Sequence, residues 1–202
     1  MASTRTVLLV ASLAALVGAA ASVYFEPTIA TRLAGTEPGQ RVLGAVLQAK
    51  APTPPDGVIV VERGGIVPAM TLKSSRGDNV SVPAAWAGRP TLVNLWATWC
   101  APCLKEMPEL QAFANQQGAD GTQVVGIALD DDAAAVQAFL NQHGITYPNL
   151  VDAPGPADAG VRLGNPNGIL PYTLLVSADG LLLKTKIGPF ASASDIGNWA
   201  KP

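Results

Sequence analysis

Cysteine and histidine are scarce in this chain of 202 residues, which holds two cysteines, Cys100 and Cys103, and one histidine, His143. Two cysteines exclude a scaffold held together by several disulfides. A closed zinc site made of Cys and His is excluded as well, because a structural zinc ion takes four ligands and the chain offers three. What remains is one Cys-x-x-Cys pair.

Charged residues are also few, at 14% of the chain against 49% hydrophobic residues. A composition so rich in apolar residues excludes a disordered protein or a charged linker. The 13 Lys and Arg residues are outnumbered by 15 Asp and Glu residues, so the basic surplus of a general nucleic-acid binder is missing. The length suits one ordinary domain with a tail, or at most two very small domains.

An uncharged apolar run occupies residues 7–25, directly after the cationic Arg5 region. In one interpretation residues 7–17 are the apolar part of a cleaved signal peptide, and Ala19-Ala20-Ala21 is the cleavage site. In the interpretation that we favour, residues 23–25 prolong the run into an uncleaved anchor, which at ~1.5 Å per residue nearly spans a ~30 Å hydrocarbon layer. Both interpretations export the rest of the chain; a buried core helix is the third alternative.

Proline and glycine recur throughout residues 27–57, which therefore read as a Pro/Gly/Ala-rich linker. A short helical turn is expected within it, at residues 42–47. We thus divide the chain into an N-terminal anchor or signal peptide (residues 1–26), the linker, and one folded domain (residues 58–202).

The predicted domain alternates between strand-like and helix-like segments. Residues 91–96 are almost continuously apolar, which is typical of a strand buried on both faces. Turn residues at 77–78 and 178–180 indicate two hairpins. We expect strands at 67–72, 80–82, 91–96, 124–129, 172–176 and 181–187, and helices at 100–116, 133–142 and 193–200. This order predicts an α/β fold with a central mixed sheet flanked by helices and an extra N-terminal strand pair.

Two further segments have expected structural roles. The aspartates at 130–132 precede the helix predicted at 133–142 and are expected to cap its N-terminus, while His143 at its end is expected to be structural. Residues 152–167 are rich in Gly, Pro and Ala and are expected to form a long loop, either a partner-recognition surface or a merely flexible connection.

Cys100 and Cys103 stand where the predicted buried strand gives way to a helix. Backbone N–H groups and aligned dipoles at a helix N-terminus stabilise an anion, so a thiolate at Cys100 is favoured. Cys103, one turn further along, can attack a mixed disulfide at Cys100 and release the product. Pro102 suits the first turn of a helix, where its missing N–H costs nothing.

A bare Cys-x-x-Cys pair has other uses besides redox chemistry, which is the use that we favour. Zinc would need a second pair of ligands, and a purely structural disulfide across so short a loop would constrain the unfolded chain little. Another alternative is a copper(I) site in which both sulfurs bind the metal and Met107 is a further ligand, since soft sulfur ligands favour Cu(I). Inert buried thiols are the last alternative.

Residues 96–103, Trp-Ala-Thr-Trp-Cys-Ala-Pro-Cys, and the Leu-Lys-Glu-Met-Pro that follows resemble membrane-anchored thioredoxin-like reductases of the TlpA/ResA type. The resemblance covers about residues 64–190 and implies a thioredoxin-like fold. Pro108 matches the proline that kinks the active-site helix of this fold. Residues 168–173 match the family's cis-proline loop, which implies a cis bond between Leu170 and Pro171, facing the cysteines; on the sequence alone a trans proline would be expected.

Asn94 stands six residues before Cys100, where ordinary thioredoxins carry a buried aspartate. The resemblance implies that Glu106 assists proton transfer instead. Glu106 follows Cys103 by three residues, so both lie on adjacent parts of one helix face. A partly buried carboxylate there would have a raised pKa and could accept the Cys103 proton; a solvated surface charge is the alternative.

The resemblance implies an exported thiol–disulfide oxidoreductase that reduces disulfides in other exported proteins, such as apocytochrome c or copper-centre assembly proteins. Cys100, Cys103 and Glu106 would be catalytic. Trp99 would shield the rim of the disulfide, and a target's extended backbone would lie beside Leu170, Pro171 and Tyr172. No organic cofactor and no metal is implied, since the cysteines carry the electrons.

The resemblance also implies where the protein lies in the cell and what supplies its electrons. The domain would lie on the periplasmic side of the bacterial cytoplasmic membrane, or free in the periplasm after cleavage. A membrane electron donor of the thioredoxin-linked type would reduce it again. A disulfide-forming oxidase is the alternative within enzymes, but Ala101-Pro102 lacks the histidine that strongly oxidising relatives carry between their cysteines. A Cu(I)-binding carrier is the alternative outside enzymes.

Overall fold

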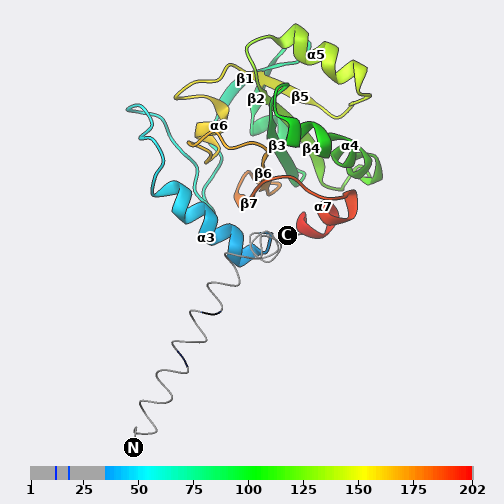
Figure 1. Ribbon diagram of the computed structural model, residues 1–202. Helices are drawn as coiled ribbons and strands as arrows, with labels where there is room; N and C mark the ends of the chain where they lie inside the picture. The colour runs from blue at the N-terminus through cyan, green and yellow to red at the C-terminus, as the bar shows by residue number, and fades with distance from the viewer. Residues whose placement is uncertain (1–11, 13–17, 19–34, 202) are drawn as a thin grey trace, which may run out of the picture. The chain divides into compact units, whose positions relative to one another are not determined.

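A seven-stranded mixed sheet forms the centre of the larger unit of the computed structural model, which describes residues 12, 18 and 35–201 (Figure 1). Along the sheet the strands follow the order β2-β1-β5-β4-β3-β6-β7. Strands β3, β4 and β5 run parallel, and the other neighbouring pairs are antiparallel. The strands are β1 (Met70–Ser74), β2 (Asn79–Val82), β3 (Thr91–Trp96), β4 (Gln123–Leu129), β5 (Asn149–Asp152), β6 (Tyr172–Val176) and β7 (Leu182–Ile187). The mixed sheet and its N-terminal strand pair, β1 and β2, confirm the predicted architecture.

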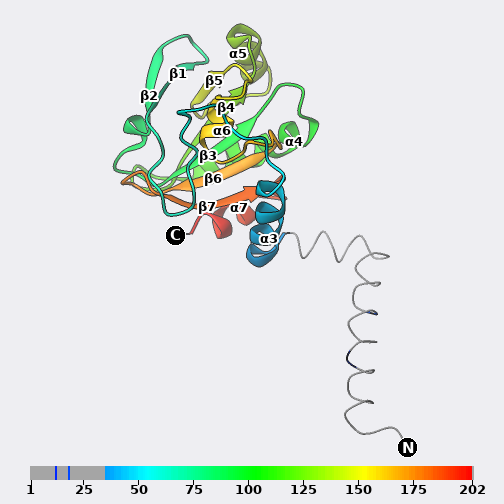
Figure 2. The same cartoon turned by 90° about the vertical axis from the view of Figure 1, so that its left-hand side faces the viewer.

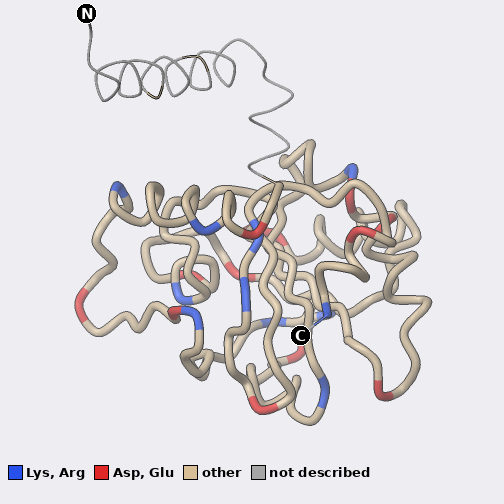
Figure 3. The backbone as a smooth tube through the Cα atoms, turned by 90° about the horizontal axis from the view of Figure 1, so that it is seen from below, with Lys and Arg blue, Asp and Glu red and all other residues tan. Residues whose placement is uncertain are grey.

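Helices cover both faces of this sheet (Figure 2). Helices α4, α5 and α7 pack on one face, whereas α6 and the short 3-10 helix η1 pack on the other. Their bounds are η1 (Ala84–Trp86), α4 (Ala101–Gln116), α5 (Ala133–Gln142), α6 (Ala159–Arg162) and α7 (Ala193–Trp199). Lys and Arg are interspersed with Asp and Glu along the backbone when the molecule is seen from below (Figure 3).

Strand β3 separates the two cores. All six of its residues are buried, as the continuous apolar run predicts. Because side chains alternate along a strand, Leu92 and Trp96 enter the core beneath α4, while Val93 and Leu95 enter the opposite one. Asn94 lies on the same face of β3 as Leu92 and Trp96, so its polar side chain also lies beneath α4.

Three short elements of the larger unit were not predicted from the sequence: the 3-10 helix η1, strand β5 and helix α6. Strand β5 is too short to show a period, and one of its residues, Asn149, is a buried amide that accepts a hydrogen bond from Trp96 Nε1 at 2.9 Å. Helix α6 is a single turn, capped by Asp158, inside the segment 152–167 that was expected to be a loop. The tight packing of Gly160 beside Leu129 and Leu95 explains the small residues there.

The chain divides after Leu47 into two units. Helix α3 (Glu37–Gln48) belongs almost entirely to the first; it is longer than the helical turn expected at residues 42–47, and none of its residues is buried. The predicted anchor at residues 7–25 lies outside the described residues, apart from Ser12 and Gly18. None of the helices within residues 12, 18 and 35–201 has the length and apolar character needed to cross a bilayer.

Candidate active site

Cys100 is the N-cap of α4 and follows β3 after a three-residue turn. The two cysteines form a disulfide with their Cα atoms 5.3 Å apart, and Cys100 Sγ accepts a hydrogen bond from the Cys103 amide at 3.3 Å. Cys100 keeps 5% of its surface exposed, whereas Cys103 is fully buried. Next to them, 69% of Trp99 is exposed. A partner approaching from solvent therefore meets Cys100 before Cys103.

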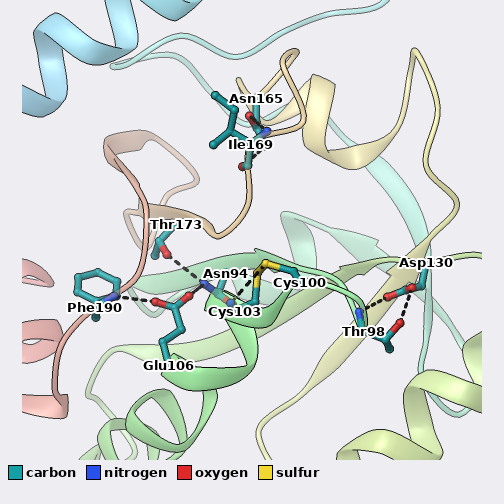
Figure 4. Close-up of a disulfide and its surroundings, with 10 residues drawn as sticks. All are labelled: Asn94, Thr98, Cys100, Cys103, Glu106, Asp130, Asn165, Ile169, Thr173 and Phe190. Carbon is teal, nitrogen blue, oxygen red and sulfur yellow. Dashed lines mark hydrogen bonds between the residues drawn. A yellow bond between two sulfur atoms is a disulfide. The ribbon is translucent and has the colours of Figure 1, made fainter. Parts of the chain in front are cut away.

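The turn before Cys100 is held by a carboxylate from the neighbouring strand (Figure 4). Asp130, at the end of β4, accepts hydrogen bonds from the Thr98 amide and the Thr98 hydroxyl, both at 2.9 Å. Only Asp132 caps α5, through the amide of Ala135 at 2.9 Å. The expectation that all three aspartates cap this helix was therefore wrong for Asp130 and Asp131. Because β3 and β4 run parallel, residues that directly follow them lie side by side at one edge of the sheet. Two predicted neighbouring parallel strands were therefore the only signal in the sequence that Asp130 could reach Thr98.

Pro171 precedes β6, and the peptide bond between Leu170 and Pro171 is cis, as the resemblance implies. Strand β6 pairs with β3 so that Tyr172 faces Leu95, which places Pro171 at the edge where β3 leads into the cysteines. Leu170 packs against the core cluster that contains both cysteines. The Tyr172 side chain instead enters the opposite core, where its hydroxyl donates to Gly164 O at 3.1 Å.

A buried asparagine braces the loop before Pro171, and sequence reasoning missed it. Asn165 Nδ2 donates to Ile169 O at 2.9 Å, and Asn165 Oδ1 accepts from the Ile169 amide at 3.1 Å. Figure 4 shows this pair above the disulfide. The two bonds hold the backbone of the loop that borders the cysteines.

Glu106 is buried beneath the disulfide, with 1% of its surface exposed. Its Oε1 accepts from Asn94 Nδ2 and its Oε2 accepts from the Phe190 amide, both at 2.8 Å (Figure 4). Asn94 Nδ2 also donates to Thr173 Oγ1 at 3.1 Å. A solvated surface charge, the alternative considered for Glu106, is therefore excluded.

Burial raises the pKa of Glu106 from 4.5 to about 7. The hydrogen bonds from Phe190 and Asn94 and the positive charge of Lys186 lower this pKa, but burial outweighs them. A group with such a pKa exchanges protons readily near neutral pH. Neither Phe190 nor Lys186 was singled out from the sequence, because each lies more than 75 residues beyond Glu106 and only the tertiary fold brings them near.

The site thus combines a disulfide-bonded cysteine pair with a titratable carboxylate one turn away on the same helix. Within residues 12, 18 and 35–201, no three side chains of His, Cys, Asp or Glu gather in the way that metal ligands do. The arrangement can exchange a disulfide and move the accompanying proton.

Comparison with known proteins places this geometry in a family. The Redoxin family model matches residues 62–198. Sporulation thiol-disulfide oxidoreductase A of Bacillus subtilis (strain 168) is 28% identical over 144 residues, which are 69% of this chain and 83% of that protein. Thiol-disulfide oxidoreductase ResA of Bacillus thuringiensis (strain Al Hakam) is 30% identical over 103 residues, which are 50% of this chain and 56% of that relative.

A solved structure supports the same assignment. The crystal structure of StoA from Bacillus subtilis superposes with a TM-score of 0.54 at 26% identity, covering 67% of this chain and 98% of the other. The expected thioredoxin-like fold and the resemblance are thereby confirmed. With the redox-capable pair at Cys100 and Cys103 and the match over residues 62–198, the chain belongs to the redoxin family as a thiol–disulfide oxidoreductase of the ResA/StoA type.

Proposed function

We propose that this oxidoreductase reduces disulfide bonds in other exported proteins, with Cys100 as nucleophile, Cys103 as resolving thiol and Glu106 as proton acceptor. The observation that carries the proposal is the buried Glu106 carboxylate one helical turn from Cys103, held by two neutral donors. Its pKa of about 7 suits a group that must both take up and release a proton at neutral pH.

The reaction starts from the reduced pair. The Cys100 thiolate, favoured at the N-terminus of α4, attacks one sulfur of the target disulfide, and the departing target sulfur leaves as a thiolate that takes a proton from solvent. Cys103 then gives its proton to Glu106 and attacks Cys100 Sγ. The mixed disulfide breaks, the second target sulfur leaves as a thiolate that takes a proton from solvent, and the Cys100–Cys103 disulfide forms; Glu106 then releases its proton to solvent. Two electrons have passed from the pair to the target.

The target would lie in the surface around Cys100. Trp99 is exposed and offers an apolar contact at the rim. The backbone of Leu170 and Pro171 borders the cysteines on the other side, where an extended segment can pair with it. Tyr172 contributes through its backbone, because its side chain is buried in the opposite core.

The proposal also includes the place and partners of the reaction. Residues 1–26 act as an anchor or signal peptide, residues 27–57 as a linker, and residues 58–202 as the folded domain on the periplasmic side of the cytoplasmic membrane. Apocytochrome c and copper-centre assembly proteins are the target classes. A thioredoxin-linked membrane donor returns electrons to the disulfide.

The direction of electron flow is tested by the reduction potential of the pair, measured by equilibration in redox buffers. Reference potentials run from about −270 mV for thioredoxin to about −120 mV for a strong oxidase. We expect a value near the thioredoxin end, because no basic residue stands between the cysteines. A value near the other end would show a disulfide-forming oxidase and contradict the proposal.

The order of attack is tested by single cysteine variants. Cys103→Ser should accumulate a stable mixed disulfide with a model peptide disulfide, because the resolving thiol is missing. Cys100→Ser, the matched control, should accumulate none, since its remaining thiol is fully buried. A Cu(I) carrier would instead take up copper stoichiometrically and turn over no disulfide.

A further inference from the structure

The turn between β7 and α7 contributes directly to the site. It supplies Phe190, whose amide is one of the two donors to Glu106. Glu109, one turn further along α4, accepts from the Ala193 amide at 2.8 Å in the same segment. Two carboxylates of α4 are thus bonded to amides of the segment 190–193, so the position of this segment determines how Phe190 meets Glu106.

Lys186 holds this turn from the other side. The half-buried ammonium donates to Gly188 O at 3.2 Å and to Pro189 O at 3.0 Å. It also lies over the Phe190 ring, 4.8 Å from the ring centroid. Bonds from a charged donor are stronger than those between neutral groups, so three contacts from one side chain fix the segment 188–190.

One peptide group connects the ammonium to the carboxylate. The carbonyl of Pro189 accepts from Lys186 Nζ, and the N–H of the same peptide group, on Phe190, donates to Glu106 Oε2. A planar peptide carries its carbonyl and its N–H on opposite sides. A positive charge at the carbonyl polarises the peptide and strengthens the bond that its N–H donates.

We propose that Lys186 is a positioning residue for the thiol–disulfide reaction, acting through the peptide group between Pro189 and Phe190 to aim and polarise the amide that stabilises the Glu106 carboxylate. This inference rests on the proposed role of Glu106 as proton acceptor. Lys186 touches neither cysteine in the structure, so its effect reaches the sulfur chemistry through Glu106 alone.

The charges around Glu106 agree with this role. The charge of Lys186 lowers the pKa of Glu106 and partly offsets burial. In return, Glu106 and Asp195 of α7 raise the pKa of Lys186, which burial lowers. Tyr147, which precedes β5, stays neutral, because burial and the charge of Glu106 both raise its pKa. The ionisable groups whose charges interact with Glu106 or Lys186 are therefore Lys186 from β7, Asp195 from α7 and Tyr147 before β5, while Glu109 of α4 bonds the Ala193 amide and Cys103 is held in the disulfide.

Lys184 offers a matched control. It lies two residues earlier on β7, so it shares the face of Lys186, and its ammonium also lies over an aromatic ring, 5.4 Å from the centroid of Trp199. Its hydrogen bond goes to Lys201 O rather than to the turn at 188–190. Its charge is not among the causes that shift the pKa of Glu106.

The test is a carbon-13 NMR titration of the Glu106 carboxyl in the full-length chain, comparing the wild type with Lys186→Met, Lys186→Gln, Lys186→Arg and Lys184→Met. We expect Lys186→Met to raise the pKa of Glu106 by roughly half a pH unit or more, because it removes both the charge and the bonds to the turn. Lys186→Arg should return the pKa close to that of the wild type, and Lys184→Met should leave it unchanged. Lys186→Gln retains a donor without the charge and should give an intermediate value.

An unchanged pKa in both Lys186→Met and Lys186→Gln would overturn the role of Lys186. The pH profile of disulfide reduction, measured on the same samples, tests Glu106 separately. If the pKa of Glu106 rises and the acid limb of the pH profile moves to higher pH by the same amount, both proposals hold. If the pKa rises while the profile stays in place, Lys186 acts on Glu106 as proposed, but Glu106 is not the proton acceptor.

Discussion

Glu106 keeps a pKa near neutral pH because the two groups that donate hydrogen bonds to its carboxylate are uncharged amides. A cation in direct contact would keep the carboxylate ionised at all useful pH values, whereas two amide donors satisfy it without abolishing its affinity for a proton. Asn94 is suited to this task, because its own Oδ1 has no hydrogen-bond partner among the described residues. That free acceptor allows the amide to turn when its neighbour changes.

Glu106→Gln tests the proton acceptor. The new side-chain amide could keep the bond from Phe190 through its oxygen, while a flipped Asn94 presents Oδ1 to the new N–H group, so the fold should survive. General-base catalysis is worth at least about 100-fold, so we expect the attack of Cys103 on the mixed disulfide to slow by about that factor at pH 7. Rapid-mixing fluorescence that separates this step from the attack of Cys100 is the measurement.

Glu109→Gln is the control for that experiment. Glu109 lies one turn further along α4 and also accepts a backbone amide, that of Ala193, but it is not fully buried. The side-chain oxygen of glutamine can still accept from the Ala193 amide and so keep the segment 190–193 in place, which is why this replacement should leave the resolving step unchanged. Equal rates in the wild type and Glu106→Gln would show that Cys103 loses its proton to another group.

At the scale of elements, the turn between β3 and α4 is positioned from β4. Asp130→Ala removes both bonds to Thr98 and leaves its half-buried amide without that partner. We expect the free energy of unfolding to fall by about 1–3 kcal/mol, and the attack of Cys100 to slow as its turn loosens. Chemical denaturation and initial reduction rates measure the two effects. Asp131→Ala, an exposed neighbour, should change neither; equal losses in both variants would refute the bracing role of Asp130.

Long periodic elements could be predicted from the sequence, and short or tertiary features could not. The buried run of β3 and the helical spacing of α4 and α5 each extend far enough to show a pattern, and α5 begins and ends at the predicted residues. Four-residue elements such as β5 and α6 show none.

The same distinction applies to the site. Its local part, Cys100, Cys103 and Glu106, lies within one helix and its cap and could be read from spacing and resemblance. The amide of Phe190 lies 84 residues from its partner Glu106 in the chain, and the carboxylate of Asp130 lies 32 residues from Thr98. Nothing in the local sequence marks Phe190, and the local sequence of Asp130 suggests a helix cap rather than a bond to Thr98, because both contacts arise only when strands and helices assemble.

The burial of Glu106 makes the stability of the whole molecule depend on pH. The pKa of Glu106 is about 7 in the folded chain, above its ordinary value of 4.5, so between these pH values the folded chain holds a proton that the unfolded chain has lost. The stabilisation is fully present below pH 4.5 and is lost as the pH rises through 7. The difference corresponds to on the order of 3 kcal/mol.

Glu106→Gln should therefore lack this pH dependence. The free energy of unfolding of the wild type, minus that of the variant, should decrease between pH 4.5 and pH 7 and then stay constant. Denaturant titrations of both proteins in the disulfide form, at matched ionic strength, measure this difference. A difference that is flat across the range, or one that increases with pH, would show that the carboxyl is not protonated in the folded chain.

The bond from Phe190 to Glu106 spans 84 residues and has a consequence for the timing of biosynthesis. A ribosome makes the cysteines and the carboxylate long before it makes residue 190, and strand β6, which flanks β3, is also synthesised late. A nascent chain therefore contains its pair of thiols while lacking both the neighbouring strand and the amide that prepare them for reaction. The site is therefore assembled only after residue 190 has been translated, so its reactivity is delayed until strand β6 and the turn at residues 188–190 can fold against it.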